Sequence, residues 1–297
     1  PCLPYLVRDG SVIHFVSLAM AYVMNMQDDP TDPEDDSLSD MLDGAPSTSP
    51  HLPVDGQQKQ RVVVLTGAGI SAESGLRTFR GSDGLWEGHR VEEVATPAAW
   101  EADPARVLRF YNDRRKQARS AKPNAAHKAL SALQRCFEVD IITQNVDDLH
   151  ERAGSARVLH LHGEVMKARS TRNYDYLIEL GSNDISLGDT CPAGSQMRPH
   201  VVWFGEEVPA MTAAAELVAQ ADILLCVGTS LQVYPAASLA FLAPDEARRI
   251  VVDPHIPESI VRTTFECIVK PASEGVPSIV RELVRDSGCH SNDHGDW

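Results

Sequence analysis

The sequence has no Cys-x-x-Cys pair, no surplus of basic residues and no apolar run long enough to span a bilayer. Its six cysteines stand far apart, at positions 2, 136, 191, 226, 267 and 289. This spacing favours neither a disulfide framework nor a zinc ribbon, and we expect reduced thiols in a cytoplasmic protein. Lys and Arg number 27 against 42 Asp and Glu, for a net charge of −15. That balance argues against nonspecific binding to nucleic acid.

The first sixty residues differ from the rest of the chain. Residues 11–26, SVIHFVSLAMAYVMNM, follow Arg8 and form an apolar segment that is too short and interrupted for a transmembrane helix. Two explanations stay open: a targeting segment, although no small-residue cleavage site follows cleanly, or translation that starts within it. Residues 27–60 are rich in Asp, Pro and Ser, and we expect disorder there because little apolar surface offsets the ordering entropy.

From Arg61 onward, short β-branched runs alternate with helical patterns. The runs RVVVLT (61–66), DIIT (140–143), RVLHL (157–161), ILLCVG (223–228) and RIVVD (249–253) are typical of buried parallel strands. Helices are predicted after the cap Pro123-Asn124 and around residues 276–284. The alternation predicts an α/β fold with a doubly wound parallel sheet. Residues 82–119 and 165–198 break the rhythm, and we expect them to form a smaller second domain.

The first polar block is GAGISAESGLRTFRG (67–81), directly after the first expected strand. Glycines at such a turn let the backbone approach a pyrophosphate, whose charge the following helix N-terminus favours. A lone Gly-x-Gly would be weak evidence, because tight turns use it too. Ser71, Arg77 and Arg80 accompany the glycines here, and two arginines beside the turn indicate anion binding.

The second block, TQNVDDLHERAG (143–154), places Gln144, Asn145 and Asp147 at the end of an apolar strand. Ligands of parallel α/β folds bind at the carboxyl ends of strands, so these side chains are candidate ligand contacts. Asp148 is instead expected to cap the next helix.

The third block, HLHGE (160–164), offers two histidines, and histidine is the natural general base near neutral pH. A period of two residues puts His160 and His162 on the same face of the strand, so periodicity does not choose between them. A single histidine of this kind is more often a hydrogen-bonded structural residue than a base.

Together these blocks resemble the sirtuin family, over about residues 61–283. RPHVVWFGE (198–206) and GTSLQVYPA (228–236) extend the resemblance. It implies a Rossmann-type sheet with a smaller inserted domain, a catalytic domain at 61–286, and a flexible tail at 287–297. It also implies that NAD is a co-substrate rather than a hydride carrier.

The resemblance assigns roles by position. It makes His162, not His160, the base, with Asn145 as the second catalytic residue. The positions that it places around NAD are Gly67, Ala68, Gly69, Arg77, Phe79, Arg80, Gln144, Asn145, Val146, Asp147, Gly228, Thr229, Ser230 and Asp253. Asp253 stands where the family usually has Asn, and its carboxylate can still accept hydroxyl hydrogen bonds. Trp203, Phe204 and Gly205 would pair with the substrate backbone as an added strand.

Tyr111 and Arg114 share a face of the helix that Asp103-Pro104 should start. Taken alone, Tyr-x-x-Arg usually marks an amphipathic surface. Within the resemblance it is similar to the pair of the subgroup that prefers succinyl-lysine and malonyl-lysine, since Arg can bind a distal carboxylate bidentately. Ala95 matches the small residue that widens that subgroup's pocket. We therefore expect negatively charged acyl groups, with deacetylation as a second activity.

The family usually places four zinc-binding cysteines between Glu164 and Arg198, where this chain has Cys191 alone. One thiol does not make a tetrahedral site, so no zinc is expected. Apolar packing from the loop 173–189 should replace the metal. The residues expected to supply it are Tyr176, Leu177, Ile178, Leu180, Ile185 and Leu187.

Competing functions stay open. An NAD-dependent protein ADP-ribosyltransferase would share the cleavage of nicotinamide, but it needs no acyl pocket. A silent NAD sensor needs no base such as His162. A hydride-transferring dehydrogenase would call for Gly-x-Gly-x-x-Gly and an acidic residue about 20 positions on, a pattern from which the sequence departs. The expected partners are the acylated lysines of substrate proteins, with neither nucleic acid nor membrane.

Overall fold

The computed structural model describes residues 59–77, 85, 86, 88–261 and 263–289. The expectations for residues 1–58, for Phe79 and Arg80, and for positions 290–297 lie outside the described residues.

A six-stranded parallel sheet carries the fold, in the order β11-β10-β9-β1-β4-β5. Its strands are β1 (Arg61–Thr66), β4 (Glu138–Thr143), β5 (Val158–His160), β9 (Ile223–Val227), β10 (Arg248–Val252) and β11 (Glu266–Ile268). Five of them contain the β-branched runs and confirm the predicted sheet. The sixth strand, β11, was not predicted, because its sequence ECI (266–268) is short and partly exposed at the edge of the sheet.

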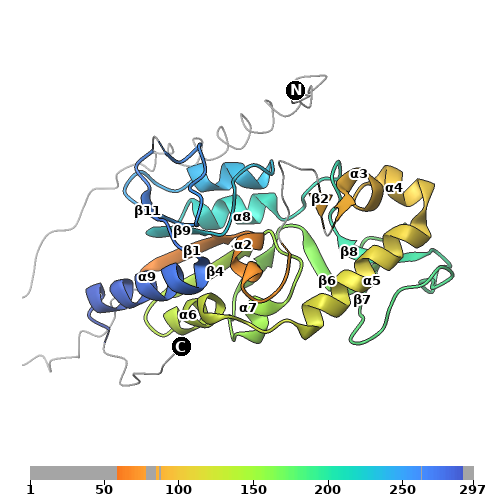
Figure 1. The fold of residues 1–297 in the computed structure, drawn as a ribbon, viewed down its shortest axis with the longest axis horizontal. Coiled ribbons are helices and arrows are strands. Elements are labelled where there is room, and N and C mark those ends of the chain that lie inside the picture. The colour runs from red at the N-terminus through yellow and green to blue at the C-terminus, as the bar shows by residue number, and fades with distance from the viewer. Residues whose placement is uncertain (1–58, 78–84, 87, 262, 290–297) are drawn as a thin grey trace, which may run out of the picture. The chain divides into compact units, whose positions relative to one another are not determined.

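Helices pack on both faces of this sheet, which makes it doubly wound as predicted (Figure 1). One face is covered by α6 (Ala125–Leu133) and α9 (Ala272–Asp286), the other by α8 (Met211–Val218) and a 3-10 helix (Ala236–Phe241). The Asn124 side chain starts α6 by accepting a hydrogen bond from Ala126 N at 2.9 Å. None of the described helices has the length and apolarity needed to cross a membrane.

The prediction of reduced thiols is wrong for one cysteine pair. Cys136 follows α6, Cys289 follows α9, and the two form a disulfide with Cα atoms 5.8 Å apart. A separation of 153 residues hides the pair from any spacing rule, and only the packing of α6 on α9 brings them together. The tail expected to be flexible from residue 287 is therefore anchored at Cys289.

A smaller layer lies at one end of the large sheet (Figure 1). It contains an antiparallel sheet of β7 (Leu177–Glu179), β6 (Gly163–Ser170) and β8 (Met197–Val201), in that order, and a two-stranded piece of β2 (Leu85–Trp86) and β3 (His89–Arg90). Its helices are α3 (Val91–Val94), α4 (Pro97–Ala102) and α5 (Pro104–Ser120). The Asp103 side chain caps α5 as expected, accepting from Arg106 N at 2.9 Å. Apolar residues of the helices and of β6 share one cluster, so the two segments that break the βα rhythm pack together.

Gly163 fixes the junction between β6 and β8. Its φ is +78°, and a Cβ atom there would lie 2.2 Å from the carbonyl oxygen of His200. Only glycine accommodates both that backbone conformation and that approach of β8.

The packing expected from the loop 173–189 is only half correct. Leu180 and Ile185 are buried against Cys191, with Tyr176 partly buried beside them. Leu177, Ile178 and Leu187 are exposed instead. The first two belong to β7, an edge strand that pairs with β6 through its backbone, so its side chains need no apolar partner. Within the described ranges, no group of three or more His, Cys, Asp or Glu residues could hold a metal ion.

Candidate active site

The turns after β1 and β9 meet at the carboxyl edge of the sheet. Gly67 N donates to Val227 O at 3.0 Å, and Gly69 N donates to Gly228 O at 2.8 Å. A Cβ atom on Gly69 would lie 2.6 Å from Gly228 Cα. The glycines predicted to approach a pyrophosphate are thus also required by the packing of the two loops on each other.

The loop after β4 joins this cluster through side chains. Asn145 Nδ2 donates to Gly67 O and to Ser71 Oγ, both at 3.1 Å. Ser71, on α2 (Ala68–Ala72), donates in turn to Asp147 Oδ2 at 3.2 Å. Gln144 Nε2 donates to Thr229 Oγ1 at 3.0 Å. The structure therefore brings together the predicted residues of three loops, and Ser71 of the first polar block links Asn145 to Asp147.

The two aspartates after β4 differ. Asp147 is buried, burial raises the pKa of its carboxyl group, and its Oδ1 accepts from Leu149 N at 3.3 Å. Asp148 occupies the position before α7 (Leu149–Arg152), as expected of a cap. Its side chain pairs with Arg152 Nη1 at 3.2 Å, so the predicted capping hydrogen bond is not formed by this residue.

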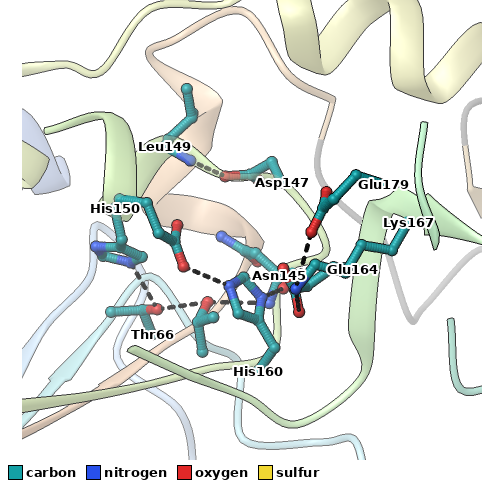
Figure 2. A network of polar contacts seen from close by, with 11 residues as sticks. Thr66, Asn145, Asp147, Leu149, His150, His160, Glu164, Lys167 and Glu179 are labelled. Atoms are coloured by element: carbon teal, nitrogen blue, oxygen red, sulfur yellow. Dashed lines mark hydrogen bonds and ion pairs between the residues drawn. The ribbon is translucent and has the colours of Figure 1, made fainter. Parts of the chain in front are cut away.

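The two histidines, which periodicity left equivalent, have different surroundings. His162 Nδ1 donates to Gln144 O at 2.9 Å, and burial lowers the pKa of the ring. A neutral His162 with its proton on Nδ1 keeps Nε2 as a basic nitrogen. His160 has contacts at both ring nitrogens, with Asn145 O and with Glu151 Oε1 (Figure 2). The geometry favours His162 as the general base.

The segment expected to receive the substrate backbone is a turn. Trp203 N donates to Glu206 Oε2 at 2.8 Å, and Trp203 O accepts from Glu206 N at 3.0 Å. Phe204 N donates to Ala95 O at 3.0 Å, and Gly205 closes the turn with a φ of +91°. Two N–H groups that an added strand would use are thus engaged within the chain. Ala95, the expected small pocket residue, is buried next to this turn.

On α5, Tyr111 is fully buried and Arg114 is 5% exposed. Burial raises the pKa of the Tyr111 hydroxyl, whose ring lies edge-on to Trp86. Arg114 lines a cavity of about 570 Å³ together with Arg77 and His89. The cavity thus joins one residue predicted to contact NAD and one predicted to contact the acyl group.

The remaining predicted NAD residues lie at the ends of the neighbouring strands. Ser230 is exposed beyond β9. Asp253 follows β10, its Oδ1 accepts from His255 N at 2.8 Å, and burial raises the pKa of its carboxyl group.

The fold and the site define a class: α/β proteins with a cluster of polar loops and a buried histidine at the carboxyl ends of parallel strands. Comparison with known proteins narrows it. The Sir2 family model matches residues 67–235. A Helicobacter pylori (strain ATCC 700392 / 26695) protein called NAD-dependent protein deacylase is 49% identical over 225 residues, covering 76% of this chain and 98% of its own. An Aggregatibacter actinomycetemcomitans protein of the same name is 56% identical over 193 residues, covering 65% of this chain and 92% of its own.

Solved structures agree with that match. A Sir2 homologue in complex with NAD is 38% identical, with a TM-score of 0.69 over 77% of this chain and 91% of its own. A complex described as Sir2, p53 peptide and NAD+ is 30% identical, with a TM-score of 0.61 over 77% of this chain and 94% of its own. The chain belongs to the Sir2 family.

Proposed function

We propose that this chain removes acyl groups from lysine side chains of proteins while consuming NAD, and that it prefers acyl groups that end in a carboxylate. The reaction would release nicotinamide and an O-acyl-ADP-ribose. Family membership and the deacylase names of the relatives support the general activity. The observation that carries the preference is the cavity that Arg77 and Arg114 line together.

The residues present fit NAD. The buried Asp147 carboxylate and the Asn145 amide lie within one hydrogen-bonded cluster, suited to an amide group such as that of nicotinamide. Thr229 and Ser230 after β9 offer hydroxyl groups, and Asp253 after β10 offers a carboxylate to ribose hydroxyls. Bound NAD would supply the electrophilic sugar carbon and a leaving group.

The protein's own part in the chemistry is to position groups and to move one proton. His162 would accept a proton at Nε2, since its Nδ1 proton is committed to Gln144 O. The lowered pKa of His162 keeps that nitrogen unprotonated near neutral pH. Ser71 and Gly67 hold the Asn145 amide in place.

The acyl preference follows from charge. Guanidinium groups bind carboxylates bidentately and more strongly than they bind neutral amides. Arg114 and Arg77 face one cavity, with His89 on its wall and Asp113 as the opposing charge. An acyl chain that ends in a carboxylate would gain a partner there, whereas an acetyl group would not.

The test compares two peptides that differ only in an acetyl or a succinyl group on one lysine, with products followed by mass spectrometry. We expect O-acyl-ADP-ribose from both and faster turnover of the succinyl peptide. Arg114→Met should lower kcat/KM for the succinyl peptide by roughly 10–100-fold, the value of a charge-assisted hydrogen bond, and leave the acetyl peptide nearly unchanged. Faster acetyl removal by the wild type would refute the preference. Nicotinamide release without deacylation of either peptide would replace the proposal with ADP-ribosyl transfer.

A further inference from the structure

His160, at the end of β5, contacts the Asn145 backbone and Glu151 of α7. Its Nδ1 is 3.0 Å from Asn145 O and its Nε2 is 2.8 Å from Glu151 Oε1. The His160 side chain is 8% exposed and the Glu151 side chain is 41% exposed, so water reaches the Glu151 contact but competes little for the contact with Asn145 O. A carbonyl oxygen and a carboxylate oxygen only accept hydrogen bonds, so both bonds form together only when each ring nitrogen carries a proton. The geometry therefore requires His160 to be an imidazolium.

The charges around His160 favour that form. Glu151 of α7 is in contact with the ring, and Glu164 of β6 faces it while paired with Lys167 at 2.9 Å. Asp147 is the third carboxyl group nearby, and His150 of α7 is buried with a lowered pKa. Burial alone would lower the pKa of His160, but Glu151, the Asn145 carbonyl and Glu164 outweigh it and raise the pKa.

Asn145, in turn, is held by hydrogen bonds of its backbone N–H, its side-chain amide and its backbone carbonyl. Its backbone N donates to Thr143 Oγ1 at 3.0 Å, and its amide donates to Gly67 O and Ser71 Oγ. Its carbonyl accepts from His160. The peptide plane after Asn145 is thus fixed by His160, a residue to which no NAD contact was assigned.

We propose that His160, kept charged by Glu151, is a positioning residue for Asn145. In HLHGE, His160 is then a fixed cation and His162 is the neutral base. This inference rests on the proposed function. If His160 loses its proton, one ring nitrogen presents a lone pair to an oxygen, and one of its two contacts turns repulsive. The hydrogen bond to the Glu151 carboxylate is charge-assisted and the stronger of the two, so the remaining proton stays on Nε2 and Asn145 O loses its donor. The Asn145 segment then loses its fixed geometry above the raised pKa of His160, while His162 remains a competent base.

Two variants of equal polarity separate the contacts. In His160→Asn the side-chain amide nitrogen replaces Nδ1 and can still donate to Asn145 O. In His160→Gln it replaces Nε2 and can reach only Glu151. Because one buried hydrogen bond separates the variants, we expect His160→Asn to stay within about threefold of the wild type in kcat and His160→Gln to fall about tenfold or more. Thermal unfolding of both variants checks that their folds survive equally. Equal losses of kcat in the two variants would overturn the assignment.

A titration that needs no turnover tests the same contacts directly. In protein labelled with ¹³C and ¹⁵N, we expect the His160 ring to titrate above the ordinary value of 6.5, with the Asn145 carbonyl shift following at the same midpoint. Glu151→Gln should lower that midpoint more than Glu164→Gln, because Glu164 makes no hydrogen bond to His160 within the described part of the chain. A midpoint at or below 6.5, or a static Asn145 carbonyl, would contradict the inference. If the wild type shows this raised midpoint but has no deacylase activity, the result would contradict the proposed function and leave the role of His160 intact.

Discussion

Glu206 neutralises two buried arginines and holds the turn that starts at Trp203, and its removal should destabilise the protein strongly. Arg198 donates to Oε1 at 2.6 Å and to Oε2 at 3.0 Å, while Arg169 reaches Oε2 at 3.4 Å. The arginine side chains are only 6% and 7% exposed. Trp203 adds a backbone hydrogen bond to the same carboxylate, and its ring lies under the Arg198 guanidinium.

Glu206→Gln leaves these cations without a counter-charge. Breaking a buried ion pair from one side costs about 3–5 kcal/mol, because the remaining charge stays buried. For a chain of this size, that loss lowers Tm by roughly 6–20 °C. Burial opposes ionisation, yet the Arg198 and Trp203 hydrogen bonds and the arginine charges lower the pKa of Glu206. The stabilisation of the folded state by Glu206 is therefore fully present above the ordinary carboxyl pKa, and it is lost as the pH falls through the lowered pKa of Glu206.

Thermal and urea unfolding at neutral pH measure the effect. Glu92→Gln is the matched control, because Glu92 pairs with Arg90 at 3.7 Å on the surface and should cost less than about 1 kcal/mol. Adding Arg198→Met to Glu206→Gln should recover part of the loss, since it removes one stranded charge. A Glu206→Gln loss no larger than that of the control would refute the reasoning.

Three further predictions concern stability. Reducing the Cys136–Cys289 bond should cost about 5 kcal/mol by chain entropy over the separation of 153 residues; a Tm shift with reductant that Cys136→Ser abolishes would confirm it. Gly163→Ala should cost more than about 3 kcal/mol, from a left-handed backbone and a clash with His200 O; urea unfolding with a normal midpoint would contradict this. Burial lowers the pKa of His127 from 6.5 to about 4. The free energy of unfolding should therefore fall by about 3 kcal/mol as the pH drops from 6.5 to about 4, because only the unfolded chain binds the proton in that range. His127→Gln should make the urea midpoint less sensitive to pH over the same range.

The large sheet was predictable because its strands are buried on both faces, which imposes runs such as RVVVLT. Helix starts were predictable where one side chain decides them, as Asn124 and Asp103 do. The smaller sheet was not, since β6 has neither a continuous apolar run nor a regular alternation, and its pairing with β8 shifts register between Glu164 and Ala168. The disulfide depends on helix packing, which leaves no local trace.

The candidate site was predictable in its membership but not in its contacts. Motif position singled out Gly67, Asn145 and Asp147, and the structure joins them through Ser71. Sequence periodicity treats His160 and His162 alike, and only their hydrogen-bond partners separate them. Trp203 was expected to offer its backbone to a substrate strand, and nothing local shows that Glu206 folds back onto that backbone.

The central place of β1 has a consequence for synthesis. β1 leaves the ribosome before either of its neighbours, so the backbone N–H and C=O groups along its two edges stay unpaired until β4 and then β9 have been made. Contacts with β4 lie 77 positions later in the chain, and contacts at the start of β9 lie 161 positions later. At translation rates of about 5–20 residues per second, one edge of β1 stays open for roughly 10–30 s. A nascent chain paused before β9 therefore exposes an unpaired edge of an apolar strand, which can pair with another chain and aggregate. Chaperones would matter most to the yield of folded protein during that interval.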